Sequence, residues 1–141
     1  MKKITFLFLL FASFACNEDD DNTPTAPVDD PFDPMETGIE LLREGTLMGV
    51  GHTVNGTVKI FDDEGKKVVV LDPFMSQNGP DLKVYLSTDQ NAAQYINLGP
   101  LKSTTGKQSY DITGMPDLDQ YKFVLVWCQE FSVLFGKAEM K

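Results

Sequence analysis

The sequence has only one histidine and two cysteines, and this shortage limits the metal and redox chemistry that it can support. A blue-copper site needs two histidines with a cysteine, and iron–sulfur ligation needs several cysteines. No Cys-x-x-Cys-His segment is present for covalent haem attachment. We therefore expect no metal site and no cofactor. One alternative stays open, a non-covalent haem held by His52 and a methionine such as Met48 or Met75.

Basic clusters and long apolar runs are also missing. Phosphate binding needs a concentrated basic patch, so we expect no nucleic-acid partner. The dozen mostly apolar residues from Ile4 to Ala15 are too few to span about 30 Å of hydrocarbon. No helical pattern is long enough to connect parallel strands, which argues against an α/β fold.

The N-terminus has the features of an exported protein. A basic start and a short apolar run predict a signal peptide over residues 1–15. Ala15 before Cys16 resembles the lipobox of bacterial lipoproteins, although Ser13 and Phe14 depart from its usual aliphatic and small residues. We expect Cys16 to be lipidated and to tie the protein to the membrane. The alternative is an ordinary signal peptide cut nearby, which leaves a free thiol.

The segment that follows Cys16 is acidic. Residues 17–21 resemble the acidic export signal of some Gram-negative lipoproteins, which predicts anchoring in the outer membrane with exposure at the cell surface. Residues 17–36 contain eight of the 21 acidic residues, no basic residue and four prolines, so they have little to bury. We expect residues 16–38 to form a disordered tether that holds the domain on the order of 50 Å from the membrane.

From about Ile39 onward, apolar and polar residues alternate with the period of a β-strand. Val54, Val58 and Ile60 share one strand face. The apolar run Val68–Leu71 is typical of a strand buried on both faces. Strong turn signals separate such runs. We predict one all-β domain over residues 39–141, an antiparallel β-sandwich or barrel of about eight short strands.

Two short stretches have more than one interpretation. Asn55-Gly56 forms either a tight hairpin turn or a bulge inside a longer strand. Ile39, Leu41 and Leu42 form either one helical turn or a lead-in strand.

Several stretches of the folded part resemble a known family. They are His52-Thr53-Val54-Asn55-Gly56-Thr57-Val58, Gly79-Pro80-Asp81-Leu82-Lys83-Val84-Tyr85-Leu86, Val126-Trp127-Cys128, Phe131-Ser132-Val133 and Phe135-Gly136-Lys137-Ala138. Over roughly residues 40–141 the chain resembles the DM-thirteen (DM13) domain, often called "electron transfer DM-thirteen". The resemblance implies a secreted or membrane-attached module whose characteristic cysteine, here Cys128, is a proposed redox group.

Cys128 has two interpretations. If Cys16 is acylated, Cys128 is the only thiol left, and an unpaired cysteine in an oxidising compartment favours a redox role. Its neighbours favour a core role, because Val124 and Val126 share its strand face and no lysine or arginine lies within three residues. Reactive cysteines generally lie in electropositive, partly exposed places, so a packed core cysteine is the more frequent case.

The remaining candidate residues are a histidine, a tryptophan and three consecutive residues of a turn. His52 is either a core or edge histidine or a single weak ligand, and Trp127 is a possible neighbour of the redox site. Gly79 and Pro80 form a turn, in which we expect Asp81 to tie down the loop through backbone N–H groups.

Two functions follow from these residues, and we predict the first, with the second as the alternative. The first is a redox or electron-transfer accessory module that uses Cys128 with an unknown redox or surface protein partner. The second is a non-catalytic binding or structural module of the cell surface with a buried, inert cysteine. We expect no enzyme activity, because no acid–base pair or catalytic triad can be assembled from these residues.

Overall fold

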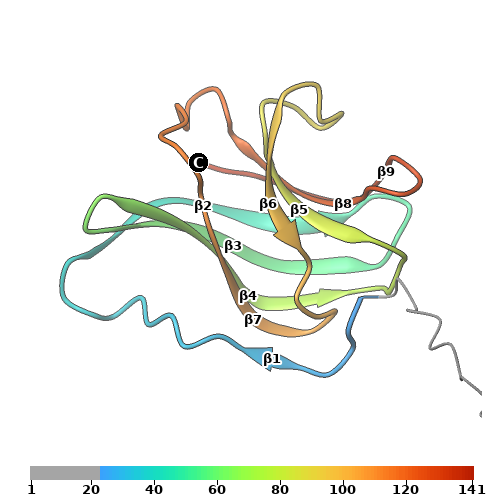
Figure 1. Cartoon of the computed structure of the whole chain (residues 1–141), viewed down its shortest axis with the longest axis horizontal. Helices are drawn as coiled ribbons and strands as arrows, with labels where there is room; N and C mark the ends of the chain where they lie inside the picture. Colours follow the sequence, from blue (N-terminus) through green and yellow to red (C-terminus); the bar gives the residue numbers. More distant parts are fainter. Residues whose placement is uncertain (1–22) are drawn as a thin grey trace, which may run out of the picture.

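The structure is a computed structural model that describes residues 23–141, in which nine strands form one curled sheet without helices (Figure 1). The strands are β1 (Val28–Asp29), β2 (Ile39–Gly49), β3 (Val54–Asp63), β4 (Lys66–Ser76), β5 (Leu82–Ser87), β6 (Tyr95–Pro100), β7 (Gly106–Asp111), β8 (Phe123–Cys128) and β9 (Val133–Glu139). Their order across the sheet is β1-β7-β4-β3-β2-β9-β8-β5-β6.

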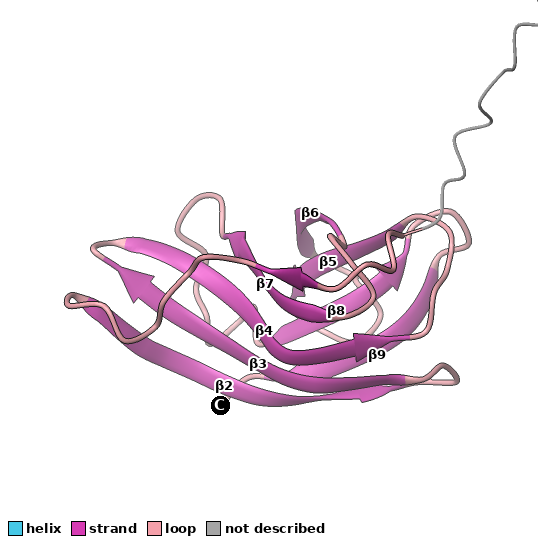
Figure 2. Cartoon of the chain, turned by 90° about the horizontal axis from the view of Figure 1, so that it is seen from below, coloured by secondary structure: helices cyan, strands magenta, loops and turns pink. Residues whose placement is uncertain are grey.

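The sheet is antiparallel throughout, except that β1 and β7 run parallel. It curls into an open half-barrel (Figure 2). The predicted all-β, antiparallel fold is confirmed, with a barrel-like curl and one strand more than expected. In the range 23–141 no helix has the length and apolar character needed to cross a membrane.

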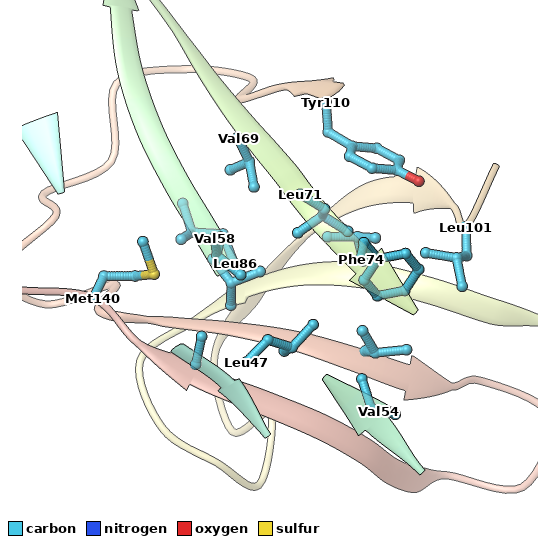
Figure 3. Close-up of a cluster of buried hydrophobic side chains, with 14 of the residues drawn as sticks. Leu47, Val54, Val58, Val69, Leu71, Phe74, Leu86, Leu101, Tyr110 and Met140 are labelled. Atoms are coloured by element: carbon cyan, nitrogen blue, oxygen red, sulfur yellow. The ribbon is translucent and has the colours of Figure 1, made fainter. Parts of the chain in front are cut away.

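The concave side of the half-barrel holds the main hydrophobic core (Figure 3). Alternating residues of the strands from β2 to β9 point into it, as the period-2 pattern predicts. The run Val68–Leu71 in β4 is buried on both faces as expected. Val69 and Leu71 belong to the concave core, while Val68 and Val70 belong to a second cluster on the outer face.

Both ambiguous stretches are strands. Gly56 lies inside β3, where the register with β4 shifts between Gly56 and Val58. Its φ is 152°, and a Cβ there would lie 2.2 Å from the carbonyl oxygen of Pro73. Gly56 therefore lies inside a longer strand and not in a hairpin turn, but the extra residue of the bulge is on the neighbouring strand, where Asp72 and Pro73 stand opposite Thr57 alone. Only glycine allows the close approach of the two backbones here. The lead-in strand is confirmed as well, since β2 begins at Ile39.

Residues 23–32, here called the strap, pack along the edge of the sheet beside β7. Thr23 is buried, and the Ser103 hydroxyl donates a hydrogen bond of 2.6 Å to the Ala26 carbonyl oxygen. For residues 23–32 this corrects the expectation of disorder, which was predicted for the tether over residues 16–38. The strap covers a sheet edge whose N–H and C=O groups would otherwise lack partners. The expected signal peptide, Cys16 and the rest of the expected tether lie outside the described residues.

Asp30 fixes the end of the strap. Its Oδ2 accepts hydrogen bonds from Lys102 Nζ at 2.6 Å, from Ser109 N at 2.6 Å and from Ser109 Oγ at 3.1 Å. Burial alone would raise the pKa of Asp30, but the hydrogen bonds from Lys102 and Ser109 outweigh it and lower the pKa. Phe32 then packs on Phe61 of the outer cluster, with 5.5 Å between ring centroids.

Candidate functional site

Cys128 is the last residue of β8 and points into the core. It shares the inward face with Val124 and Val126, and only 1% of its surface is exposed. Its Sγ donates a hydrogen bond of 3.0 Å to the carbonyl oxygen of Pro80. The thiol is therefore a packed side chain whose S–H group has a hydrogen-bond acceptor. Its strand, β8, pairs with β5 on one side and with β9 on the other.

The loop between β4 and β5 lies against Cys128. The Asn78 side-chain oxygen accepts a hydrogen bond of 2.8 Å from the Gly79 N–H, which fixes the turn. The next residue, Pro80, presents its carbonyl oxygen to the thiol. A short segment of backbone thus holds Cys128 in place at this end of the sheet.

Asp81 has a different role from the predicted one. Its carboxylate pairs with Lys83 Nζ at 2.7 Å instead of binding backbone N–H groups of the loop, so the role expected of it belongs to Asn78. Asp81 adopts a left-handed φ of 55°, and its carbonyl oxygen accepts a hydrogen bond of 3.1 Å from Gln129 N. It therefore joins the loop to the residue that follows Cys128.

Phe135 connects the loop with His52. The His52 ring stacks on the Phe135 ring, with 3.7 Å between centroids and 5° between planes. Gly79 lies against the same ring, since a Cβ at Gly79 would be 2.7 Å from Phe135 Cζ. Phe135 is placed there by a bulge, because the pairing of β9 with β8 skips it between Leu134 and Gly136.

His52 lies in the turn between β2 and β3 and is half-buried. Its Nδ1 is buried and has no hydrogen-bond partner among the described residues. Met48 and Met75 are exposed and alternate with core residues of their strands, so they lie on the outer face of the sheet. The structure therefore does not bring the proposed haem ligands together, and the contacts of His52 are those of an edge histidine.

Trp127 lies on the outer side of β8, away from Cys128. It stacks near Tyr85 with 6.1 Å between centroids, and Tyr85 in turn stacks on Tyr95 at 4.1 Å. Burial, together with Tyr95, raises the pKa of Tyr85 to about 12. Trp127 is thus part of an aromatic row on the convex face and is not a neighbour of the thiol.

The candidate residues Cys128, His52 and Gly79–Asp81 gather at one end of the half-barrel. Among residues 23–141 no three histidine, cysteine or carboxylate side chains lie close enough to hold a metal ion. A groove of about 350 Å³ lies elsewhere, lined by Glu44, Gly45, Thr46, Met48, Glu139 and Lys141. The chemistry available to the described site is therefore that of the buried thiol of Cys128, which is hydrogen-bonded to a backbone carbonyl oxygen.

Comparison with known proteins gives one family. No curated protein and no solved structure matches the chain. Residues 46–140 match the family model described as Electron transfer DM13, which covers more than half of the 141 residues and includes His52, Gly79–Asp81, Trp127 and Cys128. The predicted resemblance is therefore confirmed, and the chain belongs to the DM13 (electron transfer DM13) family.

Proposed function

We propose that this chain is a lipid-anchored, non-enzymatic module on the outer surface of a bacterial outer membrane. The apolar run before Cys16 and the acidic residues after it support the anchor. Two or more acyl chains hold a protein stably on a bilayer, whereas one holds it only marginally. In this proposal the DM13 domain serves as a binding or structural unit of the cell surface.

The burial of Cys128 is the observation that carries the non-enzymatic part of the proposal. The thiol is 1% exposed and gives its hydrogen bond to a carbonyl oxygen, which cannot act as a general base. A reactive cysteine needs access and a group that favours the thiolate. Cys128 therefore acts as a small apolar residue that ties β8 to the loop at Pro80.

Labelling of Cys128 as a function of denaturant tests this role. In residues 17–141, where Cys128 is the only cysteine, we expect no labelling by a water-soluble thiol reagent on the time scale that labels an unfolded chain. The labelling rate should rise with denaturant at the slope of global unfolding, because the thiol becomes accessible only when the core opens. Mass spectrometry at increasing urea concentrations gives both the rate and the slope.

The same experiment has a built-in reference. Circular dichroism gives the slope of global unfolding for the same protein. Rapid labelling without denaturant would contradict the core role of Cys128 and would support the redox function instead.

A redox accessory module is the second candidate, and the description of the family favours it. In that case the Cys128 thiolate would attack a disulfide of a partner protein, forming a mixed disulfide and releasing the second partner sulfur as a thiol. The thiol is 1% exposed and bonded to the Pro80 carbonyl oxygen, so the loop at Pro80 would have to open for this attack. Labelling at a rate independent of denaturant, which reports local opening, would support this second candidate.

Substitution of Cys16 tests the anchor. Cys16→Ala leaves the apolar run intact but removes the only sulfur that can be acylated near it, so we expect the protein to move from the membrane fraction to the soluble fraction. Fractionation of cells, with metabolic labelling by a fatty-acid analogue, measures this. Cys128→Ala is the matched control and should leave the protein in the membrane fraction. Equal membrane association of Cys16→Ala would contradict the lipid anchor.

A further inference from the structure

Three turns lie together at one end of the half-barrel, on the right in Figure 1. They are residues 50–53, 77–81 and 129–132, here called the loop end. Gln77 N donates a hydrogen bond of 2.6 Å to the Thr53 carbonyl oxygen, which joins the first two turns. The bond from Gln129 N to the Asp81 carbonyl oxygen joins the second turn to the third. The loop end is thus one continuous surface.

The described chain begins at the loop end. Thr23 is buried there, and its hydroxyl lies 3.4 Å from the Gly79 carbonyl oxygen, to which it donates. Cys16 is seven residues earlier, and seven residues reach at most about 25 Å. Strands β3 and β4, of 10 and 11 residues, extend about 35 Å to the opposite end. A lipid on Cys16 therefore keeps the loop end close to the membrane.

The loop end is also apolar and poor in charge. Phe131 is 64% exposed and Val50 is 39% exposed, and Val133, the residue of β9 that directly follows the third turn, is 38% exposed. The three turns contain two charged residues, Glu130 and Asp81, and Asp81 is paired with a lysine. The opposite end differs sharply, since five of the six residues in the β3–β4 hairpin at 62–67 are charged.

From the entry point of the chain and this asymmetry we propose that the loop end docks on the surface of the bilayer that holds the lipid anchor. Phe131 and Val50 enter the headgroup layer, where aromatic and apolar side chains of peripheral proteins lie. The inference rests on the proposed anchoring through Cys16. It adds that the Cys128 end of the domain faces the membrane, while the charged β3–β4 hairpin faces the surroundings.

A depth measurement on the full lipidated chain tests the orientation. Thr53→Cys at the loop end and Glu40→Cys at the opposite end are exposed positions for an environment-sensitive fluorophore. The unsubstituted chain measures the background from Cys128. In vesicles of phosphatidylethanolamine and phosphatidylglycerol we expect a blue shift, and quenching by nitroxide-labelled lipid, at Thr53→Cys but not at Glu40→Cys. Adding Phe131→Ser and Val50→Ser should abolish both signals while the protein still floats with the vesicles.

Flotation with the vesicles tests the lipid anchor, and the depth of the fluorophores in the bilayer tests the docked orientation of the loop end. A chain that floats while both fluorophores remain in water keeps the anchor and overturns the docked orientation. A Thr53→Cys fluorophore that is shielded from water but not quenched by labelled lipid also overturns it, because a second protein copy then covers the loop end. A lipidated chain that does not float overturns the anchor and the orientation with it.

Discussion

Replacing Phe135 with alanine is expected to lower the free energy of unfolding by about 3–5 kcal/mol, the range for removal of a buried aromatic ring. The ring is 5% exposed, stacks on His52 and fills the space left by the missing side chain of Gly79. Its loss leaves a cavity beside the loop that holds Cys128. Urea unfolding monitored by circular dichroism measures the change.

The substitution Phe131→Ala provides the matched control. It removes the same aromatic ring from a position four residues before Phe135, where the side chain is 64% exposed. Its effect should stay within about 0.5 kcal/mol. Phe135→Ala should also raise the rate at which Cys128 is labelled without denaturant, because the loop at Pro80 loses its support. Equal stability of the two variants would show that Phe135 does not hold the loop end together.

Much of the fold could be predicted because strand alternation is a local property. The run Val68–Leu71 predicted a strand buried on both faces, and the parity of Cys128 with Val126 predicted an inward thiol. Both follow from backbone geometry that places successive side chains on opposite faces. Such inferences need no knowledge of which strands become neighbours.

The strap could not be predicted for the opposite reason. Acidic residues and prolines in residues 17–36 indicate solvent exposure, since nothing in the segment itself supplies a partner. The partners are distant in the sequence, because Asp30 binds Lys102 and Ser109. Composition predicts whether a segment can bury itself, but it does not show that an unpaired edge such as β7 is available to it.

The candidate site was predicted in part for related reasons. Cys128 and the turn at Gly79 and Pro80 could be singled out from the sequence, but the contact of His52 with Phe135 could not. That contact depends on a bulge in β9 that turns Phe135 inward, and bulges arise from pairing between strands. The aromatic residue in β9 was visible in the sequence, but its register was not.

Gly106→Ala is expected to release the strap and to cost about 3 kcal/mol. A Cβ at Gly106 would lie 2.0 Å from the Val28 carbonyl oxygen, and the φ of 98° is itself unfavourable for alanine. The bonds from Val28 N to Thr105 and from Asp30 N to Lys107 would be lost, at about 1 kcal/mol each. Hydrogen exchange at the Val28 and Asp30 amides, combined with urea unfolding, measures the release.

The variant Gly65→Ala separates the cost of backbone strain from the cost of the steric clash between the added Cβ and the strap. Gly65 has nearly the same φ, 93°, but a Cβ there meets no atom within 4 Å. It should therefore cost only the backbone strain, about 1 kcal/mol, and leave exchange at Val28 unchanged. Slow exchange at Val28 in Gly106→Ala would mean that the strap tolerates the clash. If the strap is released, the chain between the lipid and the domain lengthens, so Gly106→Ala should also weaken the docking of the loop end on the membrane.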